Sequence, residues 1–147
     1  MKKRIIALII ILLLLIPWLV GPFVNDYIAK GIVRSIVDIP TPKNTDIVET
    51  SYKSGDLTSA TEGMEYFGAA LIKTKLDLAT LKRYYKQYST DHLEYIVEAQ
   101  PESKITVIEN DPPRFLSMLN TGTHDYYIVY AWGSSNNVLS VFDLRGY

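Results

Sequence analysis

The chain opens with an unbroken apolar stretch, Ile5 to Val24, which has 20 residues and no charged side chain. As an α-helix it would be roughly 30 Å long, which matches the hydrocarbon core of a bilayer. Lys2, Lys3 and Arg4 precede it, and cations flanking a span stay on the cytoplasmic side. The pattern predicts that residues 1–24 form a basic start and a transmembrane helix, with a cytoplasmic N-terminus and the lipid bilayer as partner.

A cleaved secretory signal would begin in a similar way. The shorter run Ile5 to Ile16, ended by Pro17, has the length of a signal's apolar region. A cleavage site also needs two small residues separated by one position. The residue two positions before Gly21 is Leu19, and the residue two positions before Ala29 is Tyr27. Both are large, so neither pair forms such a site. The sequence therefore favours an anchor that stays on the protein.

Residues 25–44 change to a mixed pattern of polar and apolar positions. Charged side chains recur every four positions: Asp26, Lys30 and Arg34. Isoleucines do the same: Ile28, Ile32 and Ile36. The two stripes fall on roughly opposite sides of a helix, which either lies on the outer membrane surface or continues the anchor as a stalk. Two prolines, in DIPTPKNT, then end this juxtamembrane helix and begin a linker.

The remaining residues, 45–147, predict one small α+β domain outside the membrane. Strand-like patterns occur at 45–52, 64–74, 92–99, 104–109, 125–133 and 138–145. Asp77 is a plausible N-cap for a helix in LATLKRYYKQY, and Asp111-Pro112-Pro113 is a typical start for a shorter helix. Closely spaced strands with one main helix indicate a mostly antiparallel sheet that the helix covers on one face.

The periodicities also predict which residues pack together. The helix presents one apolar face: Leu78, Leu81 and Tyr85. The strand after it alternates, and its inward side chains are expected to pack on that face: Leu93, Tyr95 and Val97. Gly68, inside a strand, predicts either a bulge or a close approach of another segment.

Composition and motifs exclude several classes of function. Residues 40–147 hold 10 Lys and Arg against 14 Asp and Glu, so no nucleic-acid partner is expected. The chain has no cysteine, which removes disulfides, thiolate sites and lipoprotein acylation. His92 and His124 lie too far apart for a recognisable metal motif. We expect no metal, no cofactor and no catalytic residue that a known motif would identify.

Three charged residues close to strand-like segments are candidate site residues: Glu65, Asp143 and Arg145. Two carboxylates can share general acid and base work while a guanidinium holds an anion. An ion pair or plain exposure is the commoner role of such residues. For Arg145 in particular, alternation along 138–145 predicts a paired hydrogen bond to Asp143, with Phe142 and Leu144 facing the core.

Tyrosine is the most unusual feature of the outer domain, because ten of the 11 tyrosines lie beyond residue 50. Alternation places Tyr126, Tyr130 and Trp132 on one face of a strand. An exposed face of this kind can bind a glycan or a peptide. Tyrosine is also a good strand former on half-buried faces, and this role requires no ligand.

Three stretches, GMEYFGAALIK (63–73), YYIVYAWGS (126–134) and DLRGY (143–147), resemble a set of uncharacterised single-pass membrane-anchored proteins of Gram-positive bacteria. The resemblance covers most of the outer domain. It implies one fold and a place outside the cell membrane, and it brings no catalytic residue to this chain.

The sequence therefore predicts an envelope protein with a non-enzymatic binding domain, whose partner is another envelope protein or a glycan. A small envelope-directed hydrolase is the first alternative, and it would require Glu65, Asp143 and Arg145 to line one pocket. An accessory subunit that steadies a membrane complex is the second. A flat, exposed aromatic face would favour the binding domain.

Overall fold

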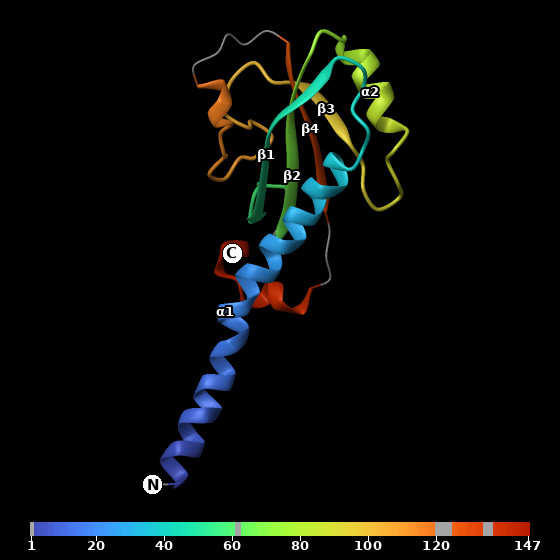
Figure 1. Ribbon diagram of the computed structural model, residues 1–147. Helices are drawn as coiled ribbons and strands as arrows, with labels where there is room; N and C mark the ends of the chain where they lie inside the picture. The colour runs from blue at the N-terminus through green and yellow to red at the C-terminus, as the bar shows by residue number, and fades with distance from the viewer. Residues whose placement is uncertain (1, 61–62, 120–124, 134–136) are drawn as a thin grey trace.

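The computed structural model describes residues 2–60, 63–119, 125–133 and 137–147 (Figure 1). A long helix, α1 (Lys2–Val37), leads into a four-stranded antiparallel sheet: β1 (Thr45–Gly55), β2 (Glu65–Thr74), β3 (Ile96–Ala99) and β4 (Tyr126–Gly133). The strands lie in the order β1-β2-β4-β3. A second helix, α2 (Leu78–Lys86), connects β2 to β3. This arrangement confirms the predicted α+β fold behind an N-terminal apolar helix.

Helix α1 continues without a break through Pro17 and Pro22. Its N-terminal half extends away from the domain (Figure 1) and exposes apolar side chains such as Leu14 and Leu19. The helix contains a span that is long and apolar enough to cross a membrane. Its C-terminal half packs on the sheet, where Ile32 is buried in the core. Residues 25–37 therefore continue the apolar segment as one helix, as the second of the two alternatives expected, and their isoleucine stripe covers the sheet.

The contact between α1 and the sheet depends on a glycine. A Cβ atom on Gly68 would lie 2.8 Å from the Ile32 side chain and 2.8 Å from the Val33 backbone nitrogen. Only a residue without a side chain fits at this distance. Of the two expectations for Gly68, the close approach is confirmed. The break in strand register lies elsewhere, in β1 between Ile47 and Glu49.

Helix α2 covers the same face of the sheet as α1. The Asp77 side chain accepts a hydrogen bond from the Thr80 backbone and so caps the helix, as predicted. Leu81 and Tyr85 are its buried residues. They belong to one core cluster with Val97, against which Leu78, Leu93 and Tyr95 pack. The predicted packing of α2 on the strand that follows it is confirmed.

The opposite face of the sheet is covered by an irregular segment, residues 103–119, which includes the 3₁₀-helix η1 (Leu116–Met118). Ile105, Ile108 and Phe115 from this segment are buried against side chains of β2 and β4. The carboxylate of Glu49 accepts hydrogen bonds from the backbone of Leu116 and Ser117 and holds η1 in place. Both faces of the sheet are therefore covered.

Two predicted strands are wrong. Residues 104–109 form turns with one isolated bridge, Lys104 to Arg114, and residues 138–145 form the 3₁₀-helices η2 (Val138–Phe142) and η3 (Leu144–Gly146). The second segment cannot extend the sheet beside β4, because β2 and β3 already occupy both edges of β4. Asn137 and Asp143 instead accept hydrogen bonds from backbone nitrogens two residues later and favour tight turns. The predicted strand at 92–99 is confirmed only for 96–99.

Candidate functional site

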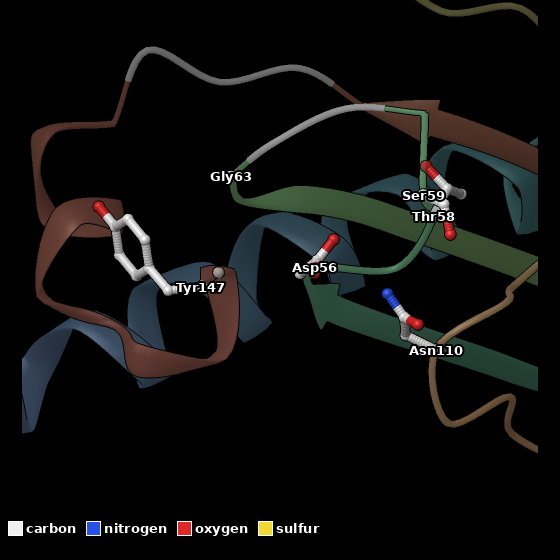
Figure 2. A pocket seen from close by; sticks show the side chains of 7 residues that line it. Asp56, Thr58, Ser59, Gly63, Asn110 and Tyr147 are labelled. Carbon is white, nitrogen blue, oxygen red and sulfur yellow. The ribbon is translucent and has the colours of Figure 1, made fainter.

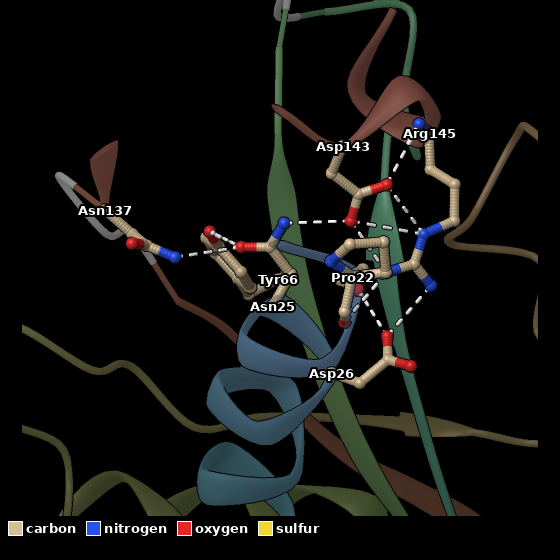
Figure 3. Close-up of polar contacts among 8 residues, drawn as sticks. Pro22, Asn25, Asp26, Tyr66, Asn137, Asp143 and Arg145 are labelled. Atoms are coloured by element: carbon tan, nitrogen blue, oxygen red, sulfur yellow. Dashed lines mark hydrogen bonds and ion pairs between the residues drawn. The ribbon is translucent and has the colours of Figure 1, made fainter. Parts of the chain in front are cut away.

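Polar side chains meet where the exposed half of α1 ends (Figure 3). Asn25 is fully buried. Its amide nitrogen donates to the Asp143 carboxylate at 2.8 Å. Its amide oxygen accepts from the Tyr66 hydroxyl at 2.8 Å and from the Asn137 amide at 3.0 Å. A single side chain of α1 therefore joins the helix to the sheet and to the C-terminal segment, residues 137–147.

Arg145 completes this connection from the C-terminal side (Figure 3). Its guanidinium donates to Asp143 from Nη2 at 2.7 Å and from Nε at 3.0 Å. It also donates to Asp26 at 2.9 Å and to the Pro22 carbonyl oxygen at 3.1 Å. We call Asn25, Asp26, Asp143 and Arg145 the C-terminal clamp. The predicted paired hydrogen bond between Arg145 and Asp143 is present, although in a 3₁₀ turn and not in a strand. The prediction that Leu144 faces the core is wrong, because the turn buries Asp143 and leaves Leu144 exposed.

One guanidinium in the clamp pairs with two carboxylates, those of Asp26 and Asp143. Burial raises the pKa of the Asp143 carboxyl, but hydrogen bonds from Arg145 and Asn25 outweigh burial and leave this pKa below its ordinary value. Hydrogen bonds to Asp143 and Asp26 raise the pKa of Arg145. Such groups remain ionised and paired, so the clamp is suited to holding two segments together.

The two candidate carboxylates serve separate structural purposes. Glu65 accepts hydrogen bonds from the backbone nitrogens of Leu57 and Thr58, at 3.0 and 2.7 Å, and holds the loop after β1. Asp143 and Arg145 line a groove of about 510 Å³ that Glu65 does not line. Glu65 therefore does not share this groove with Asp143 and Arg145, as a hydrolase that uses all three there would require.

A cleft of about 660 Å³ lies beside the loop after β1 (Figure 2). The described residues that line it include hydroxyl, carboxylate and amide side chains but no lysine or arginine: Asp56, Thr58, Ser59, Gly63, Asn110, Gly146 and Tyr147. Hydroxyl, carboxylate and amide groups in such an arrangement can bind a ligand that carries hydroxyl or amide groups. This cleft is the best candidate binding site among the described residues.

Several contacts fix the frame of the cleft. The Asp56 backbone nitrogen donates to the Arg145 carbonyl oxygen at 2.6 Å, which ties the loop to the chain end. The Ser59 backbone nitrogen donates to Glu109 at 3.0 Å. The Leu57 carbonyl oxygen accepts from the Glu109 and Asn110 backbones. Since the walls are held by hydrogen bonds on both sides, the cleft is largely formed before any ligand arrives.

The aromatic candidates lie under the irregular segment and not on an open face. Tyr126 is 7% exposed and Tyr130 is 5% exposed, while Trp132 is half-buried and packs edge-on against Phe67. The Tyr130 hydroxyl donates to Glu98 at 3.0 Å. Burial and the nearby Glu98 charge raise the pKa of Tyr130. The two tyrosine rings belong to the core, and Trp132 packs against it, so the three side chains do not form an open aromatic face.

No group of three or more potential metal-ligating side chains occurs among the residues that the structure describes. His92 is exposed in the turn before β3. His124 lies outside the described residues, so the expectation for it stays a prediction.

The charged and isoleucine stripes predicted for residues 25–44 do not include Asn25, so sequence reasoning missed its role. A signal was present in the spacing. Gly21, Asn25, Ala29, Ile32 and Ile36 recur at intervals of four, four, three and four positions and form the buried stripe of α1. The residues of the cleft carry no comparable signal, because chain segments far apart in sequence bring them together.

No protein-family model matches the chain, and neither a curated protein nor a solved structure is significantly similar to it.

Proposed function

We propose that the chain is a single-pass protein of the cell membrane. Its N-terminus is cytoplasmic, and its domain is a non-enzymatic binding module on the outer face. One observation carries this proposal: α1 is a single helix whose N-terminal half exposes apolar side chains and whose C-terminal half belongs to the domain core. The basic residues at its start, Lys2 to Arg4, support a cytoplasmic N-terminus.

The rigid joint supports a role in binding close to the membrane. The C-terminal clamp connects α1 to the chain end at hydrogen-bond distance, so the domain has a fixed height and orientation relative to the apolar segment. The cleft lies next to the chain end, which sits beside the middle of α1 (Figure 1). A partner that uses this cleft is therefore another envelope component, either a protein or a glycan, that reaches the outer surface of the bilayer.

The absence of cysteine allows a direct test of topology. Ser59→Cys places a thiol at the cleft and Lys3→Cys places one before the apolar run. In intact cells, a membrane-impermeant maleimide should label the variant at position 59 only, and lysis should expose the variant at position 3. Labelling of position 3 but not of position 59 in intact cells would reverse the proposed orientation.

A photo-crosslinking residue tests the binding role. Placed at exposed Asn110, in the cleft, it should yield a discrete adduct in native membranes. The control position is Gln87, which is also exposed but lies at the end of α2. The same residue placed there should yield no such adduct. Identical adduct patterns from both sites would show that the cleft is not the binding surface.

A further inference from the structure

The C-terminal segment lies against the part of α1 where the apolar run ends. The Phe142 ring packs edge-on against Trp18 with ring centres 5.8 Å apart. A Cβ atom on Gly21 would lie 2.9 Å from the Leu139 carbonyl oxygen, so the two backbones are close. These contacts place η2 at the level of residues 18–22, within the last turns of the predicted transmembrane span.

The outward side chains of this segment are apolar. Val138 is 75% exposed, Val141 is 57% exposed and Leu144 is 71% exposed. We call these three residues the collar. The one acidic residue among residues 138–144, Asp143, is only 1% exposed and is paired with Arg145. A segment that faces water normally shows the reverse arrangement, with charges outside and aliphatic groups inside.

The collar adjoins α1, because Leu144 lines a groove with Trp18 and Pro22 of that helix. Leu19 and Phe23 on the helix are 67% and 77% exposed. Exposed aromatic residues also occur near the collar level, on α1 and at the chain end: Trp18, Tyr27 and Tyr147. Trp and Tyr concentrate at the boundary between lipid and water.

We propose that the collar inserts into the outer interface of the bilayer, so that lipid covers Val138, Val141 and Leu144. The inference rests on the proposed membrane anchoring of α1 and specifies how deeply the domain sits. Lipid is favoured over a second protein because the collar lies beside residues 18–22 of α1, the level at which the proposed anchoring places the bilayer interface. The chain then meets the bilayer at two places far apart in sequence, and the C-terminal clamp links them.

Single cysteines that carry an environment-sensitive fluorophore test this inference in vesicles of phosphatidylcholine and phosphatidylglycerol. The collar variants are Val138→Cys, Val141→Cys and Leu144→Cys. Leu15→Cys, in the middle of the apolar run, reports the anchor. Leu116→Cys is the matched control, because Leu116 is 69% exposed but lies in η1, at the end of the domain away from the N-terminus (Figure 1).

A nitroxide attached to the lipid near its head group should strongly quench the collar labels and leave the label at position 116 bright. A nitroxide deep in the acyl chain should quench the label at position 15 most. If position 15 is quenched but the collar labels behave like position 116, the anchor stands and the inference is overturned. Collar labels that are shielded without quenching would identify a protein cover and also overturn it. If position 15 is not quenched by lipid, both proposals fail.

Discussion

Asp143 shows how a buried charge stabilises a joint between distant segments. Its carboxylate receives hydrogen bonds from Asn25 on α1 and from Arg145 near the chain end. Both donors favour the ionised form, and together they outweigh the opposing effect of burial. Because Arg145 also bonds Asp26, removal of Asp143 should loosen the clamp without leaving the guanidinium unpaired.

We predict that Asp143→Asn lowers the free energy of unfolding by about 1–3 kcal/mol at neutral pH, the range for losing a buried hydrogen-bonded partner. The folded-state pKa of Asp143 is depressed. Its stabilisation is therefore complete above the unfolded pKa of about 3.9 and disappears as pH falls through the lower folded pKa. Urea unfolding should show that the wild type is more stable than Asp143→Asn at neutral pH and that this difference disappears at strongly acidic pH.

The matched control is Asp46→Asn, since Asp46 is exposed on β1. This variant should stay within about 0.5 kcal/mol of the wild type, as ordinary surface changes do. If the wild type remains more stable than Asp143→Asn by the same free energy in strong acid, the electrostatic explanation of the clamp is wrong.

At the scale of elements, the sequence indicated most of the sheet. A strand-like apolar run identified β2, regular alternation identified β4, and a capped helical periodicity identified α2. The error at residues 138–145 has a topological cause: β4 offers this segment no free edge, because β2 and β3, from distant parts of the chain, pair with it on both sides. The same limit applies to the cleft, whose residues come from separate loops and the chain end.

Replacing a glycine by alanine should change stability in opposite directions at two positions, Gly68 in β2 and Gly31 in α1. Gly68→Ala should destabilise the domain by about 1–3 kcal/mol, because the added methyl group overpacks against α1 and meets a backbone atom as well as a side chain. Gly31→Ala, on α1 with nothing within 4 Å of the added atom, should stabilise it by about 0.5–1 kcal/mol. Thermal unfolding of both variants checks the pair, and equal effects would mean that α1 does not press on Gly68.

The packing of α2 is tested at Leu81, which is fully buried. Leu81→Ala should cost about 2–5 kcal/mol, as other large core truncations do. The neighbouring Lys82→Ala, on the exposed side of α2, should change stability by less than about 0.5 kcal/mol. If chemical denaturation shows that both variants lose the same free energy of unfolding, α2 presents a different face to the sheet.

At the scale of the whole molecule, α1 is both the apolar segment and a part of the core. Cleavage after Ala29 would separate the domain from Asn25 and Asp26, which hold the C-terminal segment. Cleavage after Gly21 would remove Trp18 and Gly21, which pack against Phe142 and Leu139 of that segment. We therefore predict that the leader is retained. Intact mass spectrometry of the protein extracted from membranes should find residues 1–29, and a mature N-terminus between Leu19 and Lys30 would refute retention.

The central claim is that no hinge separates the apolar half of α1 from the domain. The most direct measurement is amide hydrogen exchange of the full chain in lipid nanodiscs, read over residues 23–33. A continuous helix held by the C-terminal clamp and by the sheet predicts exchange in this stretch as slow as in the central strand β2. Fast exchange confined to residues 23–30, with β2 still protected, would reveal a flexible joint and contradict the account.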